Sequence, residues 1–156
     1  MNQVIKLKEK APETTATYLI SQQRSWLEER LDVNYELMGY KITGKPTREQ
    51  LQGLKAQIEE ISKPLSEERI TMALLQLKAI TKERSMSSNE SSLQIDTLVE
   101  LLSAYPADAV LKGIQFCANT CKFFPSWSEI KDEVYWYSKN RVAALGAINA
   151  KLEAMQ

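Results

Sequence analysis

The chain has 156 residues, with 20 basic and 20 acidic side chains, so its formal net charge is zero. No diffuse positive field draws it onto DNA or anionic lipid, and any nucleic-acid contact would need a local basic patch. Histidine is absent, which removes the Ser-His-Asp and Cys-His nucleophiles, histidine general bases and histidine-rich metal sites.

Helical periodicity dominates the chain, because the five glycines and five prolines are few and alternating β-branched runs are nearly absent. Residues 1–12 form a mildly basic lead without the apolar core of a signal peptide. A helix is predicted from about Glu13 to Leu31, and the glycines between Gly39 and Pro46 predict a loop. No apolar stretch is long enough to cross a membrane.

The next predicted helix opens on a capping box, with Thr47 as the N-cap and Gln50 at the third helical position, and ends at Lys63-Pro64. Its apolar residues follow a spacing of three, four and three, which is a seam too short to form an autonomous coiled coil. These residues are Leu51, Leu54, Ile58 and Ile61. The seam therefore needs a partner, either the 13–31 helix or another chain.

The second part of the chain is predicted to form a bundle. Ser66 caps a helix to about Thr81, and a serine-rich loop is expected over 82–92. Further helices are predicted over 92–104, over 107–121 after Pro106, and from a second capping box at Ser126 to about residue 153. The last helix would be roughly 40 Å long at about 1.5 Å per residue. Its far end would either pack on the N-terminal part or project to meet a partner.

These elements predict an all-α fold: a helical N-terminal arm over 1–65 and a small helical bundle with a long C-terminal helix over 66–156. A homo-oligomer could form through the arm or the C-terminal helix.

No catalytic, cofactor-binding or metal-ligating residue is predicted. Phosphate-binding glycine motifs are missing, and adjacent carboxylates such as Glu28-Glu29 diverge on a helix. Cys117 and Cys121 share one helix face, but two ligands do not complete a zinc site, so we interpret them as buried reduced thiols. The sequence therefore favours a protein that is not an enzyme and that acts by docking.

The aromatic residues are concentrated between Phe123 and Tyr137. A helix has one buried stripe, and Tyr135, Trp136 and Tyr137 spread over about 200° of arc, so at least one of Tyr135 and Trp136 should be exposed or only partly covered. An exposed aromatic is a candidate interface anchor. The predicted partner-binding residues are Trp26, Tyr40, Tyr135, Trp136 and Lys139.

Two segments, 98–110 with its Tyr105-Pro106-Ala107-Asp108 turn and 122–130 with Phe123-Phe124-Pro125-Ser126, resemble a small helical domain of phage and prophage replication proteins. Some members are similar to proteins that load or inhibit a replicative helicase and that are not themselves ATPases. The resemblance implies an adaptor in the host cytoplasm whose partners are a hexameric DnaB-type helicase and an origin-binding protein. It implies no cofactor and no catalytic residue.

Three alternatives stay open. Another phage-encoded protein, an inhibitor of a host defence or polymerase complex, would have the same composition. A helix-turn-helix regulator could use 92–104 and 107–121, although Lys112, Gln115, Asn119 and Lys122 are a thin set for reading DNA, so direct nucleic-acid binding is expected to be weak or absent. An enzyme that uses carboxylates alone would need a deep pocket with strongly perturbed carboxyl groups.

Overall fold

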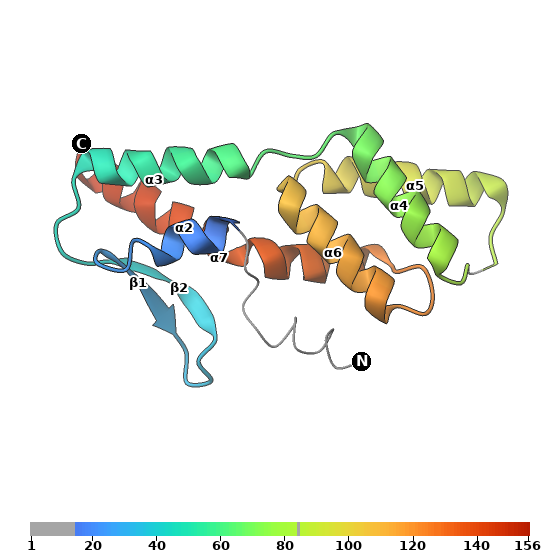
Figure 1. Ribbon diagram of the computed structural model, residues 1–156, viewed down its shortest axis with the longest axis horizontal. Helices are drawn as coiled ribbons and strands as arrows, with labels where there is room; N and C mark the ends of the chain where they lie inside the picture. Colours follow the sequence, from blue (N-terminus) through green and yellow to red (C-terminus); the bar gives the residue numbers. More distant parts are fainter. Residues whose placement is uncertain (1–14, 84) are drawn as a thin grey trace. The chain divides into compact units, whose positions relative to one another are not determined.

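The structure is a computed structural model that describes residues 15–83 and 85–156. It is mostly helical, with a small two-stranded sheet and a long C-terminal helix (Figure 1). The elements in chain order are α2 (Thr15–Ser21), β1 (Leu27–Leu31), β2 (Leu37–Ile42), α3 (Arg48–Ile61), α4 (Glu67–Ile80), α5 (Ser88–Leu102), α6 (Ala107–Thr120) and α7 (Trp127–Ala154). The basic lead over 1–12 and the expected helix start at Glu13 lie outside the described residues.

The chain divides into two compact units. The central unit contains Lys63–Tyr137, and the terminal unit contains the described residues up to Ser62 together with Ser138–Gln156. The expected division, 1–65 and 66–156, keeps the whole last helix with the bundle. The structure instead places the part of α7 after Tyr137 in the terminal unit, because its buried side chains belong to the same core as the apolar seam of α3.

The core of the terminal unit forms around that seam. Leu51, Leu54 and Ile58 are buried in one cluster with Ile20 of α2, which contacts α3, and with Ala144, Ile148 and Leu152 from the far end of α7. The seam is thus covered within one chain, and the far end of α7 packs on the N-terminal part. The capping box that opens α3 is confirmed: Gln50 N donates to Thr47 Oγ1 over 3.1 Å, and Thr47 N donates to Gln50 Oε1 over 2.9 Å.

The predicted helix over 13–31 is wrong beyond Ser21. Residues 27–31 and 37–42 pair as an antiparallel hairpin, with Leu27 opposite Ile42 and Glu29 opposite Tyr40. The expected loop from Gly39 to Pro46 accordingly begins only after Ile42. Leu27 and Leu31 are four residues apart, a spacing that fits one face of a helix as well as one face of a strand. Residues 27–31 form a strand because they pair with residues 37–42.

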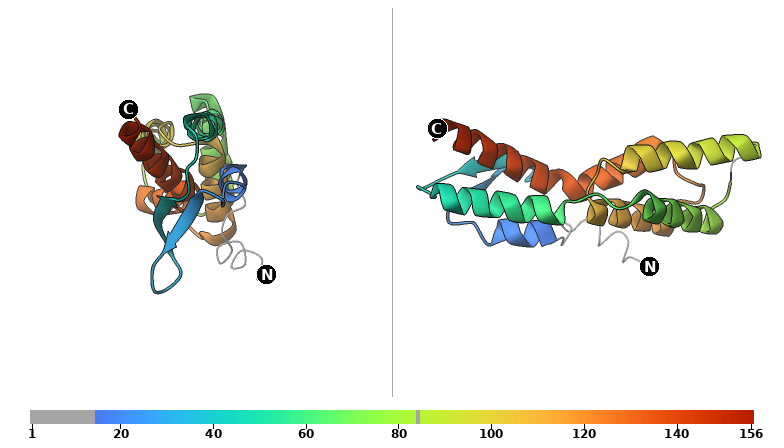
Figure 2. Two further views of the ribbon diagram at one scale, coloured as in Figure 1. Left: turned by 90° about the vertical axis from the view of Figure 1, so that its left-hand side faces the viewer. Right: turned by 90° about the horizontal axis from the view of Figure 1, so that it is seen from above.

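The central unit packs α4 against both α5 and α6, with the first part of α7 completing its core (Figures 1 and 2). Ile70, Leu74 and Leu77 of α4 are buried there with Ile130 and Val134 of α7. The Ser66 cap and the second capping box, Ser126 with Glu129, are confirmed by their hydrogen bonds. The helix predicted over 92–104 begins earlier, at Ser88, because Ser87 caps it by accepting a hydrogen bond from Glu90 N.

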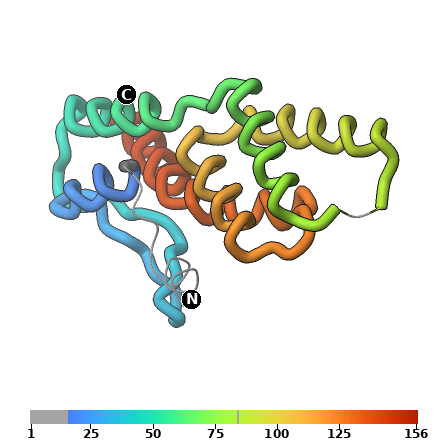
Figure 3. Tube along the Cα trace, turned by 45° about the vertical axis from the view of Figure 1, so that its right-hand side comes forward, coloured from blue at the N-terminus to red at the C-terminus, as the bar shows by residue number. Residues whose placement is uncertain are grey.

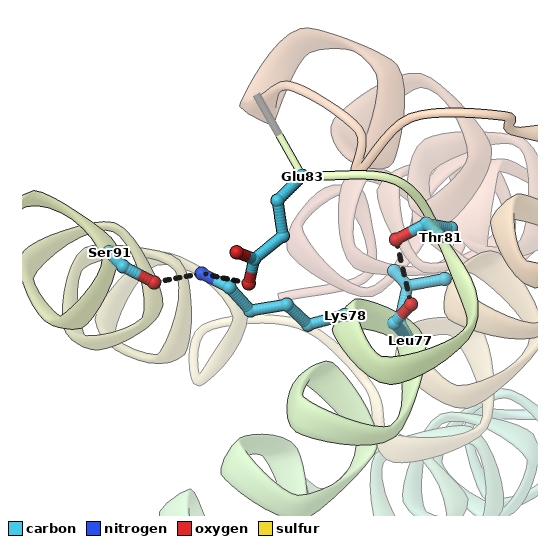
Figure 4. A network of polar contacts seen from close by, with 5 residues as sticks. All are labelled: Leu77, Lys78, Thr81, Glu83 and Ser91. Carbon is cyan, nitrogen blue, oxygen red and sulfur yellow. Dashed lines mark hydrogen bonds and ion pairs between the residues drawn. The ribbon is translucent and has the colours of Figure 1, made fainter. Parts of the chain in front are cut away.

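The segment after α4 is tied to its surroundings at several points. Lys78 Nζ donates a hydrogen bond to Ser91 Oγ on α5, and lies 3.7 Å from Glu83 Oε1 (Figure 4). The same ammonium lies 5.6 Å from the centre of the Phe124 ring. Lys82 N and Phe124 N donate across to the carbonyls of Lys122 and Lys82. These contacts hold one end of the α4–α5 pair in place.

Candidate protein-binding surface

The base of the β1–β2 hairpin is anchored in the core of the terminal unit. Trp26 is 4% exposed, Leu27 1% and Tyr40 8%, and all three pack with Leu51 and Leu54. Trp26 Nε1 donates to Gln23 Oε1 over 3.1 Å. The exposure expected of Trp26 and Tyr40 is therefore not found, because the hairpin folds both rings inward, where they fix the hairpin to α3.

The loop at the far end of the hairpin is organised by the carboxylate of Asp32. Its Oδ1 accepts hydrogen bonds from Asn34 N over 2.8 Å and from Glu36 N over 3.0 Å. Asp32 N donates to the carbonyl of Glu36, and Tyr35 N donates to the carbonyl of Asp32. An aspartate that bonds backbone amides ahead of it is a typical turn device. The loop is therefore held in one conformation before any partner arrives.

Tyr35 has a left-handed backbone, with φ of 62°. For a bulky side chain this conformation is uncommon and costs of order 1–3 kcal/mol. Glycine and asparagine adopt it far more readily. A tyrosine at such a position, with a side chain that contributes little to the core, points to a use for the ring outside the fold.

Four apolar side chains are exposed around this loop, and we call them the tip patch. Val33 is 93% exposed, Tyr35 84%, Met38 68% and Leu31 45%. The register shifts between Arg30 and Leu31, so that Met38 is the extra residue of a bulge. Bulges redirect side chains at sheet edges. Figures 1 and 3 show the loop pointing away from the helices of its own unit.

A cleft of about 290 Å³ lies beside the hairpin, between α2 and β1, and extends from Leu31 to the edge of Tyr40. Burial, together with the Glu29 carboxylate, raises the pKa of Tyr40 to about 12. The phenol therefore stays neutral at physiological pH, and it lines the cleft as a weakly polar wall.

The other three predicted partner-binding residues lie on α7. Tyr135 is 59% exposed, while Trp136 is partly buried against the core of the central unit. Lys139 is partly buried and belongs to the terminal unit. Of the five predicted residues, Tyr135 is thus the one that is largely accessible.

The two cysteines are free thiols, with Cys117 buried and Cys121 partly buried. Burial, reinforced by the adjacent Cys121, raises the pKa of the Cys117 thiol, which therefore remains protonated and a poor nucleophile. Within residues 15–83 and 85–156, no three Cys, Asp or Glu side chains are arranged to hold a metal ion.

The tip patch was not predicted from the sequence, although a signal was present. Asp32-Val33-Asn34 combines two turn-forming residues with an apolar one, between the segments 27–31 and 37–42. The arrangement offers no activated nucleophile at the tip. It offers a preformed apolar contact surface with an aromatic side chain at its centre.

No family model, curated protein or solved structure matches this chain. In the part of the chain that the structure describes, none of the helices combines the length and apolar character that a bilayer crossing requires.

Proposed function

We propose that this protein is a non-catalytic adaptor that binds a partner protein through the tip patch. The observation that carries the proposal is the exposure of Val33 and Tyr35 on a loop that hydrogen bonds to Asp32 organise, with Met38 exposed on the adjoining strand β2. Exposed apolar side chains gathered in one place mark interaction sites, and aromatic residues are frequent among the residues that dominate binding energy. The retained strain at Tyr35 supports the same role, because strained residues cluster at functional positions.

The proposed partner is a hexameric DnaB-type replicative helicase, with an origin-binding protein as a second partner in the host cytoplasm. Support for this choice comes from the resemblance of residues 98–110 and 122–130 to phage replication proteins. Loading the helicase and holding it inactive both require the same docking step. The proposal concerns that step and requires no catalysis by this chain.

Calorimetric titration of the full chain into the purified helicase of the native host, without nucleotide, tests the proposal. Binding should weaken at least about fivefold in the Val33→Ser variant, since losing a tip-patch side chain that contributes to binding should cost more than about 1 kcal/mol. Val142→Ser is the matched control, because Val142 is 60% exposed on α7 in the same unit and lies outside the tip patch.

Two results would contradict the proposal in different ways. Absence of binding to the helicase would rule out this partner, and affinity purification from the native host that retains a polymerase subunit or a nuclease effector would favour the alternative inhibitor. Binding that is equally strong in Val33→Ser and Val142→Ser would show that the partner docks elsewhere. A salt-sensitive gel shift with DNA would instead support the helix-turn-helix alternative.

A further inference from the structure

Helix α4 is apolar on two sides. Ile70, Leu74 and Leu77 are buried in the core of the central unit, whereas Met72 is 62% and Leu75 50% exposed. At 100° per residue the exposed pair lies on the opposite side of the helix from the buried stripe. A surface helix normally carries polar residues on its exposed side. Met72 and Leu75 make the exposed side of α4 apolar instead.

A groove of about 770 Å³ between α4 and α5 begins beside Met72. Val99 contributes to its apolar lining, and carboxylates surround it: Glu67 and Glu68 on α4, and Asp96 and Glu100 on α5. The structure shows no ion pair for any of these four carboxylates within residues 15–83 and 85–156. The groove thus combines the apolar side chains of Met72 and Val99 with four carboxylates.

The acidic residues on α5 work against their own helix. Asp96 and Glu100 are four residues apart, and like charges at this spacing destabilise a helix by about 0.2–0.5 kcal/mol. Glu100 also lies in the last turn of α5, near the negative end of the helix dipole, where cations are preferred. The helix dipole at the first turn of α4 favours Glu67 and Glu68 there, whereas no basic side chain among residues 15–83 and 85–156 forms an ion pair with Asp96 or Glu100.

We propose that this groove, together with the exposed side of α4, binds a basic amphipathic helix of a partner protein. Charge complementarity selects this occupant: apolar side chains of the partner would cover Met72 and Leu75, and its lysines or arginines would face Asp96 and Glu100. The exposed side from Glu68 to Ala79 extends for about three turns, or roughly 17 Å, and this length sets the partner segment at about 11–14 residues. The groove is formed by the packing of α4 against α5 within this chain, and the hydrogen bond between Lys78 and Ser91 joins the two helices beyond the groove (Figure 4).

The test uses the full chain and a fluorescently labelled probe peptide of about 14 residues, with leucines on one helical face and lysines flanking them, a length matched to three to four turns. A second probe has every lysine replaced by glutamate. Fluorescence anisotropy should report binding of the basic probe alone, weakening as salt screens the exposed charges. The double variant Asp96→Lys, Glu100→Lys should bind at least about tenfold more weakly, because it places like charges opposite the probe.

The matched control is Glu59→Lys, Glu153→Lys, which makes the same change in net charge at two exposed residues of the terminal unit. It should bind the basic probe as the unaltered chain does, and thermal melts should show both double variants folded. Equal binding of the two probes, or equal loss in both double variants, would overturn the proposal. So would an increase in probe affinity when Lys6, Lys8 and Lys10 are changed to glutamate, because the groove would then be covered by the chain's own lead. The measurement involves no helicase, so its failure and the failure of the function proposed above are separate results.

Discussion

Replacing Tyr35 by asparagine should raise the stability of the protein and weaken its binding. Asparagine tolerates the left-handed backbone that Tyr35 adopts at φ 62°, so the substitution relieves strain at this residue. The tyrosine ring is 84% exposed, and its removal therefore costs little packing. We expect the free energy of unfolding to rise by about 0.5–1 kcal/mol, which corresponds to about 1–4 °C in melting temperature for a chain of this size.

The effect on binding should have the opposite sign. If the ring is the central anchor of the tip patch, its loss should cost about 1.4–2 kcal/mol, or a tenfold to thirtyfold increase in the Kd for the helicase. Denaturant unfolding and calorimetric titration of the same preparation measure the two quantities. Tyr35→Phe is the control, since it keeps both the ring and the backbone strain and should change neither.

Either half of the result can refute the reasoning. A loss of stability in Tyr35→Asn would mean that the ring packs within the fold and that the backbone strain has a structural use. Unchanged helicase affinity, with wild-type affinity confirmed, would mean that the exposed ring is not an anchor. A general loss of structure cannot imitate the expected result, because it would lower stability and binding together.

Three further predictions concern the fold itself. Gly113→Ala should lower the free energy of unfolding by about 1–2 kcal/mol, because the added Cβ would lie 2.8 Å from Val134 Cγ2. Gly146→Ala should raise it by up to about 1 kcal/mol, because nothing lies within 4 Å of the added Cβ. Thermal melts of the two variants check both signs. The pKa of Tyr40 is raised to about 12 from about 10, so between these pH values the native state keeps a proton that the unfolded chain loses. The free energy of unfolding should therefore fall by about 1–3 kcal/mol as the pH rises through this window. Denaturant unfolding between pH 8 and 12 measures the fall, and the profile should be flatter in Tyr40→Phe. Arg141 is 2% exposed and donates a hydrogen bond to Ser62 Oγ. Arg141→Ala should lower the free energy of unfolding by about 2–4 kcal/mol, and Arg141→Met by less, because the methionine side chain still fills the site. Urea unfolding midpoints distinguish the two variants.

Local signals explain what the sequence could predict of the fold. The caps at Thr47, Ser66 and Ser126 involve residues three positions apart, so the pattern alone locates the helix starts. The apolar spacing along α4 and α6 depends on the helix period and is equally local. The start of α5 was missed for a related reason: Ser87 and Glu90 form a cap, but they lie in a serine-rich stretch that resembles a loop.

Pairing between distant segments explains what the sequence could not predict. The hairpin depends on the match of 27–31 with 37–42, and neither strand alternates clearly between apolar and polar residues. The assignment of the far end of α7 to the terminal unit depends on contacts between Ile148 and residues of α3 almost a hundred positions earlier. Such contacts are set by tertiary packing, which overrides local propensity.

The same distinction applies to the binding surface. Composition draws attention to the aromatic residues as candidate interface anchors, but it cannot say which of them the fold buries. Trp26 and Tyr40 are buried in the core of the terminal unit, where they attach the hairpin to α3. Tyr35 lies in the loop of the same hairpin, with a left-handed backbone and an exposed ring. Trp26 and Tyr40, predicted to bind a partner, are thus buried where they attach to the core the hairpin whose loop carries the proposed binding residues.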